Sequence, residues 1–384
     1  MSTRNIDPSV LLVADGASIH TCRLATALAE RGMRVHLAAF EGDSLPGVES
    51  HRLGSWPVAT DQRYLLAIPR LARLIRRIRP GVINAHYLSS YGLLATVARR
   101  VADPARHSTI LVQAVWGTDL LVTAKASRIR RALATLALRD ADLVTADSSD
   151  LLAEAAALAP STQRRRFIFG PPGGLIDRPR AEERIVVSTR RLDPDCRVRL
   201  VIAGFRAAAG MDPLAMNGWR LLIAGTGSEE ASLRAQVGED ASIEFTGWIQ
   251  PAEVHELLLR ARANVSIPVS DATSAALLEA IAAGADPVVN DLAANREWVD
   301  PSIGHFVPRD PTTDEVGRAI LAAVRFGGRA TATRELMRAA TWEVQVDGLV
   351  EAFKALLRGE GPGLIGRPRP PDLAASGAVA PRRS

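Results

Sequence analysis

The sequence predicts an α/β protein built from two Rossmann-like, doubly wound domains. Apolar runs of strand length alternate with helix-like segments almost from the first residues, a pattern typical of parallel sheets covered by helices. The alternation stops at a proline- and glycine-rich segment, residues 170–174, and then begins again. Because 384 residues suffice for two full cores, we expect two domains that face a ligand-binding cleft.

In the first half, short runs rich in Val, Leu, Ile and Ala predict buried strands at residues 10–14, 34–39, 82–85, 109–115 and 143–146. The segments between them carry apolar residues at helical spacing and predict helices at 20–31, 64–79, 90–101, 127–139 and 149–158. Gly16 and Ala17 close the turn after the first strand, where glycine permits close approach to the backbone.

In the second half, the same patterns predict strands at 184–188, 219–224, 243–245, 263–267 and 287–290, and helices that include 251–262 and 274–283. The proline- and glycine-rich segment between the two halves reads as an interdomain linker. We therefore set the domains at 1–176 and 177–340, followed by a helix at 341–358. The tail, 359–384, is rich in Pro, Arg, Gly and Ala, and we expect it to be disordered.

Composition narrows the class of protein. With 47% apolar and 23% charged residues, the chain reads as a soluble globular protein. Cys22 and Cys196 are its only cysteines, so we expect no disulfide framework and a reducing, cytoplasmic location. The opening residues, MSTRNIDPSV, contain no apolar signal region, and no uninterrupted apolar run approaches 18 residues. We expect neither a secretion signal nor a membrane span.

The basic residues are almost all arginine: Lys125 and Lys354 are the only lysines among 47 basic residues. Arginines cluster at 70–79, 128–131 and 164–166. In the first cluster, apolar residues recur at helical spacing, so a solvated helix face is the ordinary interpretation, and contact with an anionic membrane surface or an acidic acceptor is the alternative. Nucleic acid is disfavoured, because the chain has no zinc-finger spacing and only 4% aromatic residues.

The most informative segment is residues 270–297, SDATSAALLEAIAAGADPVVNDLAANRE. Asp271 lies in a polar loop, and Glu279 follows eight residues later in an apolar helix. An acid pair at this spacing is common by chance, so its context must supply the specificity. The free backbone N–H groups that open the helix, those of Thr273, Ser274 and Ala275, form a natural site for an anion.

The context of this pair is similar to that in a known family. Gly225-Thr226-Gly227 after a strand, residues 243–248 and Asn295-Arg296-Glu297 follow the family's order, and residues 16–21, 85–87 and 116–119 match it more loosely. Over about residues 8–358, the chain resembles the retaining nucleotide-sugar glycosyltransferases of the GT-B fold, family 4 or group 1, whose signature is E-x7-E. Here the first acid is Asp271, giving D-x7-E.

The resemblance implies that the second domain binds a nucleotide diphosphate sugar and the first binds the acceptor, with the helix at 341–358 crossing back onto the first domain. It assigns Glu279 to the ribose hydroxyls and Asp271 to the transferred sugar. The family's diphosphate-binding arginine corresponds to Arg191, and its following lysine corresponds to Cys196. Arg197 or Arg199 could replace that lysine, or the site uses one arginine. Catalysis would then rest on Asp271, Glu279 and Arg191.

The remaining candidates come from loops at predicted strand ends. Donor contacts are expected from Gly16, Ala17, Arg197, Gly225, Gly227 and Trp248, together with the backbone that opens the helix at Thr273. Contacts to the acceptor or the sugar are expected from His20, His86, Trp116 and Asp119. Trp116 stands where the family often has a histidine before glycine. A structural role is the alternative for each histidine.

Two D-x-D sequences, Asp140-Ala141-Asp142 and Asp193-Pro194-Asp195, resemble the metal motif of a different glycosyltransferase fold. Such short pairs are common, and the two-unit architecture argues against that fold. We therefore expect neither a metal ion nor a cofactor beyond the nucleotide sugar.

The sequence thus predicts a retaining hexosyltransferase with a small soluble acceptor, such as an aminosugar, a cyclitol, a thiol metabolite or a natural-product intermediate. A lipid-linked envelope glycan is the competing acceptor. A nucleotide-sugar epimerase of the same shape and a non-catalytic sugar-binding relative are the rival functions. The donor base and the oligomeric state remain open at this stage.

Overall fold

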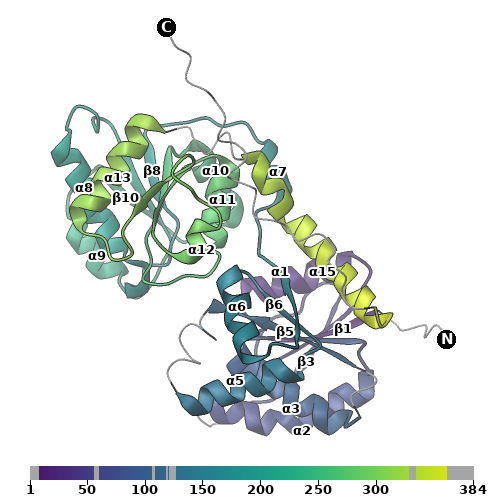
Figure 1. Cartoon of the computed structure of the whole chain (residues 1–384). Coiled ribbons are helices and arrows are strands. Elements are labelled where there is room, and N and C mark those ends of the chain that lie inside the picture. The colour runs from purple at the N-terminus through teal and green to yellow at the C-terminus, as the bar shows by residue number, and fades with distance from the viewer. Residues whose placement is uncertain are drawn as a thin grey trace. The chain divides into compact units, whose positions relative to one another are not determined.

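The structure, a computed structural model, describes residues 8–55, 60–105, 109–117, 120, 127–327 and 334–360. The candidate Asp119 and the predicted tail beyond residue 360 lie outside these ranges. The chain divides into two compact units. One runs through Phe169 and includes the segment that begins at Val344, and the other is Gly170–Glu343 (Figure 1).

The first unit contains a seven-stranded sheet in the order β3-β2-β1-β4-β5-β6-β7. All of its strand pairs are parallel. The strands are β1 (Ser9–Val13), β2 (Arg34–Ala39), β3 (Val48–Arg52), β4 (Val82–His86), β5 (Ile110–Val115), β6 (Leu143–Ala146) and β7 (Gln163–Arg166). Strand β1 lies in the interior of the sheet and is buried along its whole length, as the apolar run at residues 10–13 predicts.

Helices cover both faces of this sheet (Figure 1). Leu71, Leu74 and Ile75 of α2 share a core with Leu11 and Val13 of β1, whereas the arginines between those apolar residues are exposed. The helical segment at 64–79 therefore has the solvated basic face that its spacing predicts. The helices are α1 (Ile19–Glu30), α2 (Thr60–Ile78), α3 (Leu93–Ala102), α5 (Arg128–Asp140), α6 (Ser149–Leu158) and α15 (Trp342–Leu357), with a π-helical turn at Leu88–Gly92.

The second unit contains a six-stranded parallel sheet in the order β10-β9-β8-β11-β12-β13. Its strands are β8 (Ile185–Ser188), β9 (Arg220–Ala224), β10 (Ile243–Gly247), β11 (Ala263–Ser266), β12 (Asp286–Asn290) and β13 (His305–Val307). These two parallel sheets confirm the predicted α/β architecture of two Rossmann-like domains.

In the second unit, α8, α9 and α13 pack on one face of the sheet, and their apolar residues form a core cluster with those of the strands. Figure 1 shows α10, α11 and α12 on the opposite side of the sheet from these three helices. The helices are α7 (Gly173–Asp177), α8 (Val198–Met211), α9 (Glu230–Val237), α10 (Pro251–Arg260), α11 (Ala275–Ala283), α12 (Ala293–Arg296) and α13 (Thr313–Phe326), with 3₁₀ turns at Pro194–Cys196 and Arg334–Ala340.

Local sequence explains where several helices begin and end. Ser274 caps α11 by accepting a hydrogen bond from the Leu277 N–H, and Gly284 ends that helix in the left-handed region at φ 81°. Thr312 and Glu315 form a capping box at α13. Within the ranges that the structure covers, every helix is too short or too polar to cross a membrane.

Each sheet has one point where the strand order reverses direction. In the first sheet this point lies between β1 and β4, and in the second it lies between β8 and β11. Loops that follow two such strands diverge to opposite faces and leave a crevice at the carboxyl edge, where open α/β sheets bind ligands. The loops after β8 and β11 are the ones that carry residues 189–197 and 267–274.

Candidate functional site

Three polar side chains meet at the switch point of the second sheet. Arg190, in the loop after β8, donates a hydrogen bond from Nη1 to Asp271 Oδ2 at 2.8 Å and to Ser274 Oγ at 3.0 Å. Asp271 lies in the loop after β11, and Ser274 is the cap residue of α11. The same two loops are joined by a backbone hydrogen bond from Val269 N to Asp195 O, 2.8 Å. The arrangement therefore fixes a guanidinium beside a helix N-terminus.

Arg190 is largely buried, with 16% of its side chain exposed. Burial acts to lower its pKa, but the Asp271 carboxylate opposes this effect, and the pKa of Arg190 is raised above its ordinary value. Burial likewise raises the pKa of the Cys196 thiol, against the opposing charge of Arg190. Arg190 thus stays a permanent cation, while Cys196, where the family has a lysine, is a buried neutral thiol at neutral pH.

The two arginines that the sequence predicts at the diphosphate, Arg191 and Arg197, contact residues other than Asp271. The Arg191 side chain is 70% exposed and ion-paired with Asp193 at 2.8 Å and with Asp195 at 3.5 Å. Arg197 has a left-handed backbone, φ 54°, and bonds to Arg309 O and Asp310. It is Arg190, which the sequence reasoning passed over, that contacts Asp271.

Glu279 lies on α11 with 20% of its side chain exposed. Its Oε1 lies 3.6 Å from Nε2 of His255 on α10, and this ring nitrogen makes no hydrogen bond to any residue that the structure describes. His255 was not predicted as a site residue, because the contact depends on the packing of two helices that are distant in sequence. The half-buried Glu279 carboxylate thus lies beside the His255 ring, and its oxygens can accept hydrogen bonds from a ligand.

Gly225 and Gly227 bring the loop after β9 against the loop that carries Arg190. A Cβ atom at Gly225 would overlap Arg190 O, and one at Gly227 would lie 2.5 Å from the backbone of Leu192. Gly225 also has φ 148°, a conformation that favours glycine. These glycines therefore support the arginine loop by close backbone packing.

The other donor-side candidates lie at the same edge of the sheet. Trp248 follows β10 and is 63% exposed, so its indole is free of the core. Thr273 Oγ1 lies 3.4 Å from Trp298 Nε1, and Ala275 is the first residue of α11. Asn290 ties the end of β12 to the loop after β11 by donating from Nδ2 to Pro268 O, 2.7 Å. This bond steadies the loop that leads to Asp271.

In the first unit, His86 ends the switch-point strand β4 and is 1% exposed. Its Nε2 lies 2.8 Å from Asn84 Oδ1, an acceptor, so Nε2 carries the proton and Nδ1 a lone pair. Nδ1 is buried and has no hydrogen-bond partner in the described part of the chain. Burial, and next the charge of His20, lower the pKa of His86 to about 4. His86 is therefore a neutral hydrogen-bond acceptor at physiological pH.

Trp116, whose ring centroid lies 5.8 Å from that of His86, joins that histidine to a group of aromatic rings. Trp116 stacks on Tyr87, with centroids 5.3 Å apart, and on Phe169, also 5.3 Å apart. The His20 ring lies 4.8 Å from Phe169. His86 and Trp116 line a cavity of about 20 Å³ at the carboxyl edge of the sheet, large enough for about one water molecule. The structure thus brings together three of the four predicted acceptor-side residues, and Asp119 lies outside the described ranges.

Gly16 lies in the loop after β1, on the other side of this switch point. A Cβ atom there would overlap Glu41 O, and Gly42 packs on the Gly16 backbone with φ 129°. The Ala17 N–H donates to Asp15 Oδ1 at 3.1 Å. Close packing of the loops after β1 and β2 thus accounts for the glycine at position 16.

Comparison with known proteins identifies the family. The Glycosyl transferase 4-like family model matches residues 9–148, and the Glycosyl transferases group 1 model matches residues 183–325. The chain is therefore a two-domain glycosyltransferase, with a 4-like domain in its first half and a group 1 domain in its second. The resemblance to glycosyltransferases that the sequence predicts is thereby confirmed. No curated protein matches the sequence.

Solved structures share the GT-B fold of this glycosyltransferase at low sequence identity. Sucrose-phosphate synthase from Thermosynechococcus elongatus superposes with a TM-score of 0.71 at 16% identity, over 92% of this chain and 100% of that chain. Anabaena HepE in complex with UDP-glucose gives 0.70 at 14% identity, over 91% and 99%. An α,α-trehalose-phosphate synthase from Burkholderia xenovorans in complex with glucose-6-phosphate gives 0.66 at 11% identity, over 90% and 100%.

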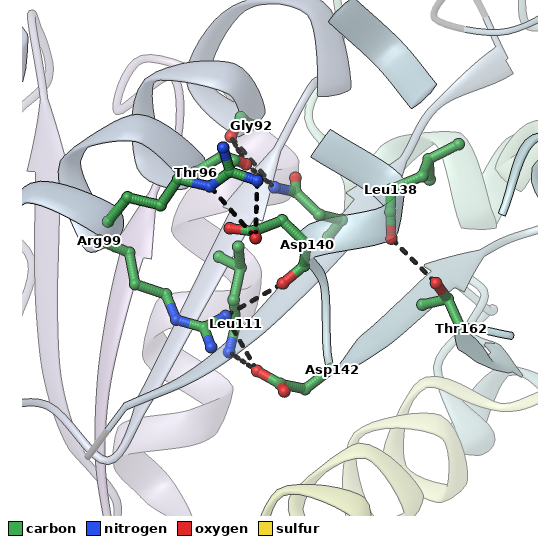
Figure 2. Close-up of polar contacts among 10 residues, drawn as sticks. Gly92, Thr96, Arg99, Leu111, Leu138, Asp140, Asp142 and Thr162 are labelled. Carbon is green, nitrogen blue, oxygen red and sulfur yellow. Dashed lines mark hydrogen bonds and ion pairs between the residues drawn. The ribbon is translucent and has the colours of Figure 1, made fainter. Parts of the chain in front are cut away.

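The D-x-D sequences of this glycosyltransferase have structural partners. Asp140 accepts from Arg100 at 3.0 Å, and Asp142 pairs with Arg99 at 3.0 Å while it accepts from the Leu111 N–H at 2.7 Å. Figure 2 shows Asp142 facing Arg99 of α3 and Leu111 of β5.

The second D-x-D, Asp193 to Asp195, is engaged in the same way. Asp193 Oδ1 accepts hydrogen bonds from the Ser228 N–H and hydroxyl, each at 2.9 Å. The bond from the N–H is the main cause that holds the pKa of Asp193 below its ordinary value. Its other oxygen pairs with Arg191 at 2.8 Å. Both motifs therefore serve to hold loops and helices together.

Proposed function

We propose that this glycosyltransferase moves a hexosyl group from a nucleotide diphosphate sugar to a small soluble acceptor, with retention of the anomeric configuration. The observation that carries the proposal is the cluster of Arg190, Asp271 and Ser274 at the head of α11. It joins a fixed cation to a helix N-terminus at the switch point of the second sheet.

In this proposal the donor's diphosphate binds at the head of α11. Arg190 is permanently charged and forms bidentate contacts with phosphate well, and the first N–H groups of α11 are aligned with the positive end of the helix dipole. Asp271 holds the guanidinium in place and, by family resemblance, contacts the transferred sugar. Glu279, half-buried in the next turn, accepts hydrogen bonds from the ribose hydroxyls. HepE, of the same fold, has been solved with UDP-glucose, which supports this type of donor.

The reaction breaks the bond between the anomeric carbon and the diphosphate oxygen and forms a bond from the acceptor oxygen to the same face of that carbon. The acceptor proton passes to the departing phosphate oxygen, so no protein base is needed. Negative charge grows on the diphosphate as the bond breaks, and preorganised Arg190 and the α11 N–H groups stabilise it. Because these groups supply the positive charge, we propose that transfer requires no divalent metal ion.

The acceptor is proposed to bind in the first unit at the edge that carries His86 and Trp116. The stacked rings of Tyr87, Trp116 and Phe169 offer an apolar platform to a sugar or cyclitol ring. The buried, neutral Nδ1 of His86 can accept a hydrogen bond from a water molecule at the same edge. A trehalose-phosphate synthase of the same fold has been solved with glucose-6-phosphate, a small soluble sugar derivative, in support of an acceptor of this size.

A thermal-shift screen of the full chain with UDP, GDP and their hexose conjugates tests the donor class. A ligand at about 100 times its Kd stabilises the fold by about 2.7 kcal/mol, so the correct nucleotide raises Tm by several degrees. Mixing the stabilising nucleotide sugar with candidate acceptors, and following release of the nucleotide, then tests transfer. No stabilisation by any nucleotide diphosphate would contradict the proposal.

A further inference from the structure

A second cluster of ligand-type side chains lies in the first unit, away from the carboxyl edge. His36 comes from the middle of β2, and Glu49 and His51 come from the edge strand β3. The parallel register places Glu49 opposite His36 and His51 opposite Ala38, and side chains two residues apart share one face of a sheet. The three side chains therefore converge at one place on that face.

The distances within the cluster match those between the ligands of a metal ion. Nδ1 of His36 and Nε2 of His51 are 3.0 Å apart, and the Glu49 oxygens lie 3.4 Å and 3.5 Å from these two nitrogens. Ligands at about 2.0–2.1 Å around a tetrahedral zinc ion are roughly 3.3 Å from one another. Two imidazoles and a carboxylate are also the ligand types that zinc and related ions prefer. Both the spacing and the chemistry thus fit a single ion.

Burial in the cluster is graded in a way that suits a site open on one side. His36 is buried, His51 is half-buried and Glu49 is exposed. An ion held by the three side chains would keep a fourth position toward solvent, where water can complete a tetrahedron.

We propose that His36, Glu49 and His51 bind a divalent transition-metal ion, with zinc as the expected occupant, which joins the edge strand β3 to β2. β3 pairs with the sheet along one side only, and three of its five residues are exposed, so few apolar contacts hold it. A metal bridge would stabilise this edge because binding energy adds directly to folding energy. The site is independent of the donor and acceptor sites and takes no part in transfer.

One neighbouring cation bears on this site. Arg77 Nη2, on the exposed side of α2, lies 3.5 Å from Nδ1 of His51. When Nε2 of His51 binds an ion, Nδ1 carries the ring proton, and Arg77 must give up this weak contact. The positive charge of Arg77 therefore opposes binding of the ion, and the Arg77→Ala variant should bind metal at least as tightly as the wild type.

Cobalt(II) titration of the full chain, without a histidine tag, tests the proposal. A tetrahedral Co²⁺ site absorbs visibly, and we expect saturable absorption at one ion per chain, displaced by Zn²⁺, and a rise in Tm with Zn²⁺ that a chelator reverses. Glu49→Gln and His51→Ala should each weaken Co²⁺ binding by about 10–100-fold or more. Loss of a residue that only hydrogen-bonds a metal ligand already has an effect of this size.

Glu244→Gln is the matched control, because Glu244 is an exposed glutamate on the edge strand β10 of the other sheet. It should bind Co²⁺ like the wild type. Hydrogen bonds alone could also hold the three side chains together, and they predict no cobalt absorption. Absence of absorption, or absorption unchanged in both Glu49→Gln and His51→Ala, would overturn the proposal.

Discussion

Arg190 and Asp271 form an ion pair, 2.8 Å between Nη1 and Oδ2, that joins the loops after β8 and β11 across the switch point of the second sheet. Both side chains are mostly buried, so each depends on the other for its charge to be tolerated. A bound diphosphate would offer Arg190 a second anionic partner. The pair therefore links the stability of the free protein to its affinity for the donor.

This linkage predicts the behaviour of Asp271→Ala. Without the carboxylate, the largely buried guanidinium lacks its counter-charge, and the free energy of unfolding should fall by about 1–3 kcal/mol. Added nucleoside diphosphate should raise Tm by more in this variant than in the wild type, because the ligand restores a negative partner. Thermal unfolding with and without the nucleotide measures both effects. An unchanged Tm in the free variant, or a smaller shift with nucleotide, would contradict the role of Asp271 as the partner of Arg190.

Glu279→Gln tests the ribose assignment. The substitution keeps the size of the side chain but removes the charge that strengthens hydrogen bonds from two hydroxyls, so nucleotide affinity should fall about 10-fold or more. Calorimetry with the nucleotide measures the change. Glu256→Gln is the control, since Glu256 is an exposed glutamate on the neighbouring helix α10 and should bind nucleotide normally. Equal affinities for the two variants would remove Glu279 from the donor site.

His86 predicts a pH dependence of stability. Its folded pKa is lowered from 6.5 to about 4, so between these pH values the unfolded ring is protonated and the folded ring is not. Protonation then favours the unfolded state, and stability falls as pH decreases from about 6.5 toward 4, by up to about 3 kcal/mol. Chemical denaturation at pH 7 and pH 4.5 should show a smaller loss for His86→Gln than for the wild type. Parallel losses in the two proteins would show that His86 keeps an ordinary pKa.

The proposed reaction predicts the product's stereochemistry. With an α-linked nucleotide sugar, NMR coupling at the new anomeric carbon should report an α-linked product, and transfer should continue in excess chelator. Arg190 and the N-terminus of α11 supply the positive charge that other transferases take from a cation. A β-linked product would exclude retention. If a chelator abolished activity and manganese restored it, the D-x-D carboxylates would again be candidate metal ligands.

The sequence predicted the buried strands and most of the helices of the first unit, because short apolar runs such as residues 10–14 leave little choice of structure. It did not predict β3 and β7, whose polar residues VESHR and QRRR lie on edge strands with exposed side chains. Nor did it define α8 and α13, which are buried against each other and the sheet. Such edge segments become strands because they pair with a neighbouring strand, and the local pattern of apolar residues does not predict this pairing.

The site was predicted less completely than the fold. The acid pair, Asp271 and Glu279, and the glycine turns could be recognised in the sequence, because their spacing and backbone needs are local. The choice between Arg190 and Arg191 depends on the direction in which each side chain leaves the bent loop after β8, and the local sequence does not show that direction. His255 lies 24 residues before Glu279 in the sequence and reaches it only through the packing of α10 on α11.

The most direct test of the donor site compares Arg190→Ala with Arg191→Ala. The two arginines are adjacent in sequence, yet one contacts Asp271 and Ser274 while the other is exposed beside Asp193. Calorimetric titration with the nucleoside diphosphate should show affinity reduced about 10–100-fold in Arg190→Ala, as expected for loss of a hydrogen bond to a charged group, and changed less than about 3-fold in Arg191→Ala. The opposite order, or no loss in either variant, would contradict a diphosphate site at the head of α11.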